Sequence, residues 1–478
     1  MTAAARAYDL LVVGAGPAGL MAAVTAARHG AAVALLDESP APGGQVYKAT
    51  PAGIPSPSPP SPEHIEGERL RALLRASGAV TLLAHQVWSV GPGFHVHAIG
   101  PGGPVALTAP RLVVATGTHE RVVPFPGWTT PGVLGLAAAT LLIKSQRMLP
   151  GRATLVAGCG PLLVAVAAGI VKAGGCVVAV VDIAGPGDWL RRLPALLSRP
   201  DLLARGMGWV GTLRAAKVPL LSRHALSAVL QEAGSLQATV HRVEAGGAPV
   251  AGSERRLVAD CIVAGNGLVP RNDISRVLRA DHRYEQALGG WVPATDARGR
   301  TSVDGLYVTG DGGGVTGAAA AECHGELVGL SVLHDMGTLA KPVYARAAVR
   351  AEQQLRRARR FGAAMGSLMA LRPAQVGAIP LDTIVCRCED VTRAEIEAAI
   401  DDGAREVNQV KAWTRCGMGP CQGRTCGDVV GELVAQRVGS REAAGWFTGR
   451  LPLRPVPLAA LTGDYAYADI PIPKAAPL

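Results

Sequence analysis

Short apolar runs that end in glycine recur along this chain, separated by longer segments with helical spacing. Four apolar residues, Leu10–Val13, run directly into a glycine-rich turn. An alanine-rich stretch follows, and Val33–Asp37 is a second apolar run that ends in an acid. A short continuous apolar run bounded by turn residues is typical of a strand that is covered on both faces. The N-terminal stretch therefore predicts a strand–turn–helix–strand unit of an α/β fold.

The glycines in the turn of this unit are spaced for binding a dinucleotide. Gly14 allows the tight turn, Gly16 lets the backbone approach a pyrophosphate, and Gly19 lets the helix pack closely on the strand. We expect the pyrophosphate at the helix N-terminus, where unpaired N–H groups favour an anion. Asp37 is expected to accept from a ribose hydroxyl. This unit by itself fits FAD and NAD equally.

Two later turns extend the predicted nucleotide site and favour a flavin. A buried run leads into Thr116-Gly117, and a later strand ends in Gly310-Asp311. We expect the Asp311 carboxylate to face a ribityl hydroxyl of FAD. The whole predicted set, with a loop beneath the cofactor and a strand residue beside the adenine, is Gly14, Gly16, Pro17, Ala18, Gly19, Asp37, Glu38, Gly44, Gln45, Val87, Thr116, Gly117, Gly310 and Asp311.

A second unit repeats this plan further along the chain. Ala153–Gly160 is an apolar run that enters a glycine turn, and Val177–Asp182 is the matching second strand. Leu163 stands where the fingerprint has its third glycine. A leucine there should push the helix away from the strand and crowd the pyrophosphate. We therefore expect the dinucleotide-binding fold to persist here without tight NAD(P)H binding.

These motifs resemble the flavoproteins of the pyridine nucleotide-disulfide oxidoreductase type, which carry two dinucleotide-binding domains. Glu120-Arg121 and Pro124–Val133 narrow the resemblance to the large α subunits of opine oxidases, hydroxyproline dehydrogenases and hydrogen cyanide synthase, over nearly the whole chain. The chain has no Cys-x-x-Cys pair, which excludes a disulfide active site of the thioredoxin reductase type. No catalytic acid–base set is recognisable, so no catalytic residue is assigned.

Five of the nine cysteines fall within one C-terminal stretch, which core packing alone would not produce. Clustered thiolates select zinc or an iron–sulfur centre. Zinc sites usually separate paired ligands by two to four residues. That spacing fits Cys421 and Cys426 but not Cys386-x-Cys388. Iron–sulfur is favoured, and zinc is the alternative.

The same stretch resembles the bacterioferritin-associated-ferredoxin-like [2Fe–2S] domain through the run Arg-x-Gly-Met-Gly-x-Cys-Gln-Gly-x-x-Cys that ends at Cys426. The resemblance implies a cluster held by Cys386, Cys388, Cys421 and Cys426. Cys416 is the departure from this set, and a thiol so close to the cluster could compete as a ligand.

Composition and charge exclude several other classes. A hydrophobic content of 49% indicates a globular protein. The formal charge of +10 would suit a nucleic-acid partner, but the densest basic run, Arg356–Arg360, lacks interleaved aromatics, so we expect none. No apolar leader precedes the first strand, and Leu155–Val171 is broken by glycine and proline, so we expect no export signal and no transmembrane segment. Cysteines without such a signal indicate reduced thiols in the cytoplasm.

The expected architecture is α/β, with two Rossmann-like dinucleotide-binding domains and a small C-terminal cysteine-rich [2Fe–2S]-binding domain. The predicted boundaries are 1–120 for the first half of the FAD-binding domain, 121–260 for the inserted second dinucleotide-binding domain, 261–340 for the second half of the FAD-binding domain, 341–380 for a helical bridge, 381–440 for the cysteine domain and 441–478 for a C-terminal tail.

The resemblance implies an α subunit, containing FAD and [2Fe–2S], of a heteromeric amine or amino-acid dehydrogenase. A partner β subunit similar to amino-acid oxidases would oxidise an opine, hydroxyproline or glycine at its C–N bond, and a small third subunit is a further candidate partner. Electrons would pass through an FMN at the subunit interface to the cofactors of this chain, and the second dinucleotide site is open to NAD or ATP. Two alternatives stay open. One is a stand-alone NAD(P)H reductase that feeds its own iron–sulfur centre, and the other is a redox-sensing module that binds nucleic acid.

Overall fold

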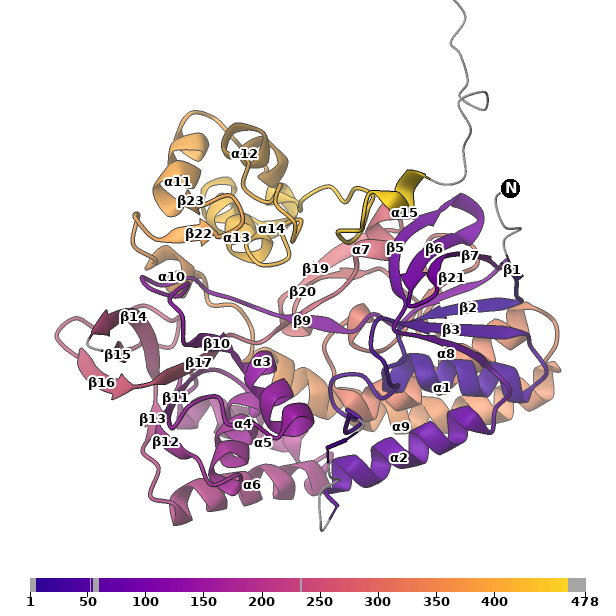
Figure 1. Cartoon of the computed structure of the whole chain (residues 1–478), viewed down its shortest axis with the longest axis horizontal. Coiled ribbons are helices and arrows are strands. Elements are labelled where there is room, and N and C mark those ends of the chain that lie inside the picture. Colours follow the sequence, from indigo (N-terminus) through magenta and orange to yellow (C-terminus); the bar gives the residue numbers. More distant parts are fainter. Residues whose placement is uncertain (1–5, 52, 55–59, 233, 463–478) are drawn as a thin grey trace, which may run out of the picture.

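The chain builds two parallel sheets, each with its own strand–turn–helix–strand unit, and a small helical domain that lies above the region between them (Figure 1). The computed structural model describes residues 6–51, 53–54, 60–232 and 234–462. The arrangement confirms the predicted α/β fold with two dinucleotide-binding units and a C-terminal cysteine domain.

The first sheet is parallel, with the strand order β21–β8–β2–β3–β4. Its apolar runs are buried because helices cover one face and a second sheet covers the other. The edge strand β21 comes from beyond the second unit. The bounds are β2 (Leu10–Val13), β3 (Val33–Asp37), β4 (Val80–Leu83), β8 (Leu112–Val114), β21 (Leu306–Val308), α1 (Pro17–Arg28), α2 (Pro62–Arg75) and α8 (Ala318–Asp335).

A four-stranded sheet packs on the first sheet, in the order β1–β7–β6–β5. Leu107 and Val96 from this sheet share a buried core with Leu11 and Leu112 of the first. A register shift in β5 falls directly after Val87. The bounds are β1 (Arg6–Ala7), β5 (Gln86–Gly91), β6 (His95–Gly100) and β7 (Gly103–Thr108).

The second parallel sheet has the order β10–β17–β11–β12–β13. β17 pairs with β11 along its whole length, so residue 261, the predicted start of the return to the first domain, still belongs to the second. The chain therefore leaves this sheet only after Gly265. The bounds are β10 (Val133–Gly135), β11 (Ala153–Gly158), β12 (Cys176–Asp182), β13 (Leu220–Ser222), β17 (Cys261–Gly265), α3 (Leu136–Leu141), α4 (Pro161–Lys172), α5 (Pro186–Leu196) and α6 (Pro200–Ala215).

Smaller antiparallel elements complete the two units. A three-stranded sheet packs its apolar face on the second parallel sheet. The antiparallel pair β9–β18 joins the segments that enter and leave the second unit, and β19–β20 is a hairpin that follows it. The bounds are β14 (His224–Glu232), β15 (Ser235–Arg242), β16 (Arg255–Ala259), β9 (Thr118–Glu120), β18 (Leu268–Pro270), α7 (Asp273–Val277), β19 (His282–Glu285) and β20 (Gly290–Pro293).

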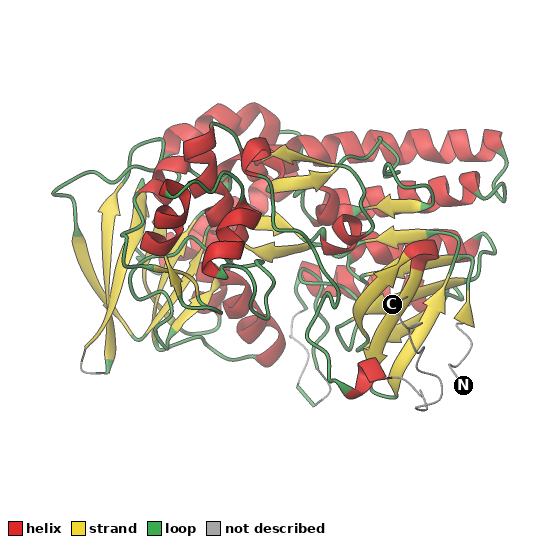
Figure 2. Ribbon diagram, turned by 90° about the horizontal axis from the view of Figure 1, so that it is seen from above, coloured by secondary structure: helices red, strands yellow, loops and turns green. Residues whose placement is uncertain are grey.

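A long helix, α9 (Lys341–Leu368), bridges to the cysteine domain. Figure 2 shows the long helices side by side, with strands at both ends of the long axis of the molecule. The cysteine domain begins at α10 (Pro373–Gly377), and α14 packs on α13, so its core runs past the expected boundary at 440. Its other elements are β22 (Ile384–Cys386), β23 (Val391–Thr392), α11 (Arg393–Asp401), α12 (Val407–Thr414), α13 (Gly427–Val438) and α14 (Arg441–Ala444), followed by α15 (Ala459–Thr462). Of the helices in the described ranges, none combines the length and apolar character needed to cross a bilayer.

Candidate cofactor sites

The first glycine turn forms an open cradle at the N-terminus of α1. A Cβ atom on Gly14 would overlap the carbonyl oxygen of Ala115, and one on Gly19 would overlap the carbonyl oxygen of Gly14, so both glycines serve close backbone packing. A Cβ on Gly16 would meet only the Cα of Gly44, at 3.9 Å. No side chain caps the helix. The residues present therefore fit a pyrophosphate in front of Gly16.

The acids after β3 lie beside this cradle. Asp37 accepts the N–H of Ala15 on Oδ2 at 2.5 Å and the N–H of Ser39 on Oδ1 at 2.7 Å, which fixes its carboxylate. Burial alone would raise the pKa of Glu38, but the guanidinium of Arg271, 3.2 Å away, holds that pKa below its ordinary value. Two oriented carboxylates at this edge suit the hydroxyls of a ribose.

The turns that follow β8 and β21 lie at the same end of the sheet as the glycine turn, because β8 and β21 are parallel neighbours. The Thr116 hydroxyl donates to the carbonyl oxygen of Arg271 at 2.5 Å, and the Arg271 N–H donates to the Gly117 carbonyl at 2.8 Å. These bonds tie the turn after β8 to the segment that returns from the second unit. The structure thus places the turns after β2, β3, β8 and β21 together at the carboxyl ends of these parallel strands, where ligands of open α/β sheets bind.

At the end of β21, Asp311 is held by its own loop. Its Oδ1 accepts the N–H groups of Thr316 and Gly317, both at 2.8 Å, and burial raises the pKa of this carboxyl. The N–H of Gly310 donates to Nδ1 of His324 at 3.3 Å, so this buried histidine positions the turn. Contact of Asp311 with a flavin stays a prediction.

The other predicted flavin residues lie around the same edge. Pro17 begins α1, and Ala18 is buried against Ala115. Gln45 is exposed just after the loop glycine at position 44, and Val87 is half-buried on β5.

Replacing Gly16 with valine is expected to leave the fold intact and weaken FAD binding about a hundredfold. The side chain would enter the open space and separate the pyrophosphate from N–H donors, and two charge-assisted hydrogen bonds are together worth roughly 3 kcal/mol or more. Titration of flavin-free protein with FAD, followed by flavin fluorescence, measures the change. The control is Gly208→Val on α6, where an added Cβ meets nothing within 4 Å. Unchanged affinity in Gly16→Val would place the flavin elsewhere.

The matching turn of the second unit is closed by a distant side chain. A Cβ on Gly160 would overlap the side chain of Met369, which follows α9 and packs with Cys159 in a small apolar cluster. Leu163 is fully buried in the core of this unit. The sequence predicts crowding by Leu163, whereas the side chain that fills the turn is Met369.

Asp182, the acid at the end of the second strand of the second unit, is largely covered by protein as well. Asp182 ends β12, as Asp37 ends β3, but burial raises the pKa of Asp182 to about 6 against hydrogen bonds from Ala184 and Trp189 that lower it. A mostly apolar cavity of about 270 Å³ lies near this sheet end beside Gly158, yet neither Gly160 nor Asp182 lines it. Among the described residues, the second glycine turn is thus filled by Met369 and burial raises the pKa of the acid that ends β12, which disfavours binding of a pyrophosphate and a ribose at these two positions.

The structure gathers three of the five clustered cysteines into a buried group. The Sγ atoms of Cys386, Cys416 and Cys426 all lie within 4.8 Å of one another, and those of Cys416 and Cys426 are 3.9 Å apart. Cys388 and Cys421 form a neighbouring hydrogen-bonded pair. Two predicted ligands thus lie with Cys416, the residue outside the implied ligand set, and the other two lie beside this group.

The surroundings of the sulfurs fit a metal centre. Hydrogen bonds from the thiols of Cys416 and Cys426 hold the pKa of Cys386 well below its ordinary value. The backbone N–H of Gly417 also lowers the pKa of Cys386, and that of Gly423 lowers the pKa of Cys421 against the effect of burial. A thiolate among thiols and N–H donors is the donor set of a [2Fe–2S] cluster, and four thiolates equally suit zinc.

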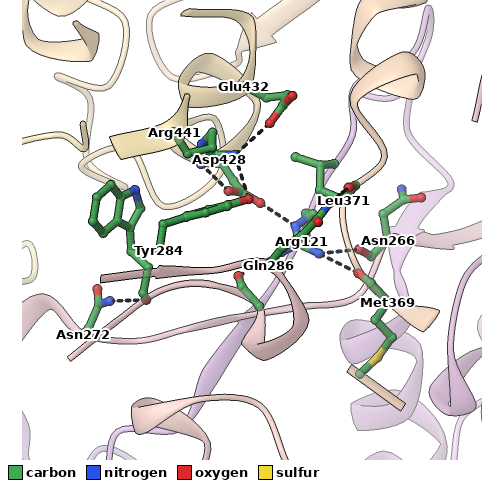
Figure 3. Close-up of polar contacts among 12 residues, drawn as sticks. Arg121, Asn266, Asn272, Tyr284, Gln286, Met369, Leu371, Asp428, Glu432 and Arg441 are labelled. Carbon is green, nitrogen blue, oxygen red and sulfur yellow. Dashed lines mark hydrogen bonds and ion pairs between the residues drawn. The ribbon is translucent and has the colours of Figure 1, made fainter. Parts of the chain in front are cut away.

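A buried ion network joins the cysteine domain to the rest of the chain (Figure 3). Asp428, in the first turn of α13, accepts from Arg121 Nε at 2.5 Å and from Arg441 at 2.7 Å, and Arg441 also contacts Glu432 at 3.3 Å. Arg121 further donates to the carbonyl oxygens of Met369, Gly289 and Asn266 at 2.8, 2.9 and 3.2 Å. One guanidinium therefore ties together the segments that meet between the two cofactor sites.

Comparison with known proteins agrees with this geometry. Residues 8–325 match the family model of pyridine nucleotide-disulphide oxidoreductases, and residues 382–464 match the sarcosine oxidase A3 domain. The chain belongs to the pyridine nucleotide-disulphide oxidoreductase family. It is an FAD-dependent oxidoreductase, as its sequence predicted. It is 34% identical over 468 residues to an opine oxidase subunit of Agrobacterium tumefaciens (strain Ach5), covering 95% of this chain and 91% of that relative.

Two further comparisons cover nearly the whole oxidoreductase. Hydrogen cyanide synthase subunit HcnB of Pseudomonas aeruginosa (strain PAO1) is 32% identical over 466 residues, covering 94% of this chain and 97% of the relative. The crystal structure of L-proline dehydrogenase from P. horikoshii matches with a TM-score of 0.69 at 20% identity, over 95% of this chain and 79% of that one. The last likeness concerns the fold alone.

Proposed function

We propose that this oxidoreductase is the α subunit of a heteromeric amine or amino-acid dehydrogenase, and that it relays electrons through an FAD and a [2Fe–2S] centre. The observation that carries the proposal is the closed second unit. A chain with an open flavin cradle and a cysteine group, but with Met369 in its second glycine turn, needs an electron source other than its own nicotinamide site. Relatives named as subunits of opine oxidase and hydrogen cyanide synthase support a partner chain as that source.

In this proposal the chain positions cofactors that carry the redox chemistry. A bound flavin can take two electrons and release them singly, and an iron–sulfur centre carries one at a time. The turn at Gly16 would hold the pyrophosphate and Asp37 would orient the ribose. Cysteines of the C-terminal domain would hold the cluster, with the N–H groups of Gly417 and Gly423 tuning its sulfurs.

The proposed partner is a smaller flavoprotein of the amino-acid oxidase type, in which an opine, hydroxyproline or glycine loses hydride from its C–N bond. An FMN at the interface and a small third subunit would complete the assembly in the cytoplasm.

Co-purification tests this proposal directly. The tagged full chain, expressed together with its neighbouring reading frames, should bring down a second flavoprotein in a fixed ratio. The complex should then reduce an artificial acceptor with one of the three substrate classes, whereas the isolated chain should not. Substrate oxidation by the isolated chain would overturn the division of labour between the subunits.

The stand-alone reductase alternative predicts the opposite behaviour toward nicotinamides. We expect anaerobic mixing of the flavin-loaded chain with excess NADH or NADPH to leave the flavin absorbance unchanged over seconds, while dithionite bleaches it. Met369→Ala, which empties the turn at Gly160, is the matched variant. Rapid bleaching of the wild-type flavin would favour the reductase. Bleaching only in Met369→Ala would show that the Met369 side chain prevents nicotinamide binding in the second unit.

A further inference from the structure

A cavity of about 90 Å³, lined by both charged and apolar side chains, lies at the seam between the first domain and the cysteine domain. One wall comes from β18, α7 and β20, and the other from the loop between Cys421 and Cys426 and the chain after α14. The cavity has room for several water molecules, or for one small polyatomic ion. Its charged lining consists of the guanidinium groups of Arg276, Arg424, Arg441 and Arg450 and the carboxylates of Asp273 and Asp428.

Both carboxylates of the cavity are already engaged. Asp428 lies between Arg121 and Arg441 in the buried network, at 2.5 and 2.7 Å. The carboxylate of Asp273 pairs with Arg424 at 3.4 Å. The lining therefore carries more positive charge than its own acids neutralise.

Arg276 is a cation of the lining that neither of these two carboxylates pairs with. Its guanidinium lies 5.4 Å from the ring centre of Trp446, and within the described residues no ion pair includes it. Its Nε is buried without a hydrogen-bond partner. Burial lowers the pKa of Arg276 to about 10, against the opposing charges of Asp273 and Asp428. A largely buried guanidinium that forms no ion pair is incompletely neutralised, so an anion in the cavity would stabilise it.

Other unpartnered donors belong to the same lining. Among the residues that the structure describes, Trp291 Nε1, Arg441 Nε and His119 Nδ1 are buried nitrogens that also lack a hydrogen-bond partner. Burial lowers the pKa of His119 to about 4, so its ring is neutral at neutral pH and keeps one N–H to donate. Buried polar groups in native proteins are nearly always satisfied, so several orphaned nitrogens around one cavity indicate a ligand rich in acceptor oxygens.

We propose that this cavity binds a phosphate group, either as free inorganic phosphate or as the phosphate of a small monoester. A planar guanidinium fork and several further N–H donors match the many acceptor oxygens of a phosphate better than the two of a carboxylate. The rings of Trp446 and Phe447 in the lining offer a surface for the organic part of a monoester. The site lies between the two cofactor sites and is separate from the cradle at Gly16.

Calorimetric titration of the full, flavin-loaded chain tests the proposal, because a bound flavin blocks the cradle at Gly16. Inorganic phosphate and phenyl phosphate are the probes, each against potassium chloride at equal ionic strength. We expect saturable phosphate binding that Arg276→Gln weakens about tenfold or more, since it removes a charge-assisted contact. Trp291→Phe, which removes the indole N–H together with the pyrrole ring but keeps an aromatic side chain, should weaken it a few-fold. Tighter binding of phenyl phosphate would indicate a monoester, and weaker or equal binding would indicate free phosphate.

Arg279→Gln is the matched control, since it removes the same charge at an exposed position outside the cavity. Heats no larger than those of chloride would overturn the proposal, as would equal phosphate affinities of Arg276→Gln and Arg279→Gln. If Arg276→Gln does not fold, judged by circular dichroism, Trp291→Phe decides, and unchanged affinity in that variant would reject the site. None of these outcomes depends on the partner subunit or on substrate oxidation.

Discussion

Replacing Cys386 with alanine is expected to remove all of the iron bound by the protein, together with its visible absorbance. The thiols of Cys416 and Cys426 and nearby backbone N–H groups hold the pKa of Cys386 well below its ordinary value. It belongs both to the ligand set implied by the resemblance and to the group of three that lies within 4.8 Å. Iron and zinc analysis per chain, with the visible spectrum, measures the loss. Cys176→Ala, an exposed cysteine outside the group, should keep the full metal content.

The remaining cysteines distinguish the two ligand sets. If the ligands are Cys386, Cys388, Cys421 and Cys426, then Cys416→Ala should retain the cluster and Cys388→Ala should lose it. The reverse pattern would mean that the buried group with Cys416 holds the metal. A colourless wild-type protein that contains zinc would contradict an iron–sulfur centre altogether.

Replacing Asp428 with alanine is expected to destabilise the folded chain by about 3–5 kcal/mol, the usual cost of removing one partner from a buried ion pair. Among the described residues, the change would leave Arg121 without an ion-pair partner and Arg441 paired with Glu432 alone. Their charges hold the pKa of Asp428 well below its ordinary value, although burial alone would raise it. Urea unfolding followed by circular dichroism would report the loss.

Asp402→Ala is the control for this change, since it removes an exposed carboxylate of the same domain. It should alter the free energy of unfolding by no more than about 0.5 kcal/mol. Similar losses in both variants would mean that the buried network contributes nothing beyond an ordinary surface charge.

The sequence was informative where the structure depends on neighbours along the chain. The turn at Gly14–Gly19 is predictable because the glycine spacing is that of a dinucleotide-binding turn, and within the turn Gly19 packs directly on the carbonyl oxygen of Gly14. The acid at the end of β3 follows from strand length and helix length alone. The same reasoning identified the second unit, since its apolar runs repeat the pattern of the first.

Contacts between distant segments could not be predicted in this way. Met369 reaches the turn at Gly160 from the C-terminal end of α9, and no local sequence pattern predicts that this methionine fills that turn. The buried grouping of Cys416 depends on how the loop after α12 folds back, although the equal spacing of Cys416, Cys421 and Cys426 was a signal in the sequence. Arg121 stood in the motif used for the resemblance, but its ion-pair partner, Asp428, comes from the C-terminal domain.

The edge strand of the first sheet has a consequence for synthesis of the protein. β8 ends at Val114, whereas its neighbour β21 begins at Leu306, after the whole second unit. Until that strand emerges from the ribosome, one side of β8 has unpaired N–H and C=O groups flanked by apolar side chains, which is the template for pairing with another chain. The interval is long because domains are made at only about 5–20 residues per second. A nascent chain of this protein thus depends on prompt folding of the insertion, or on chaperones, to protect an open sheet.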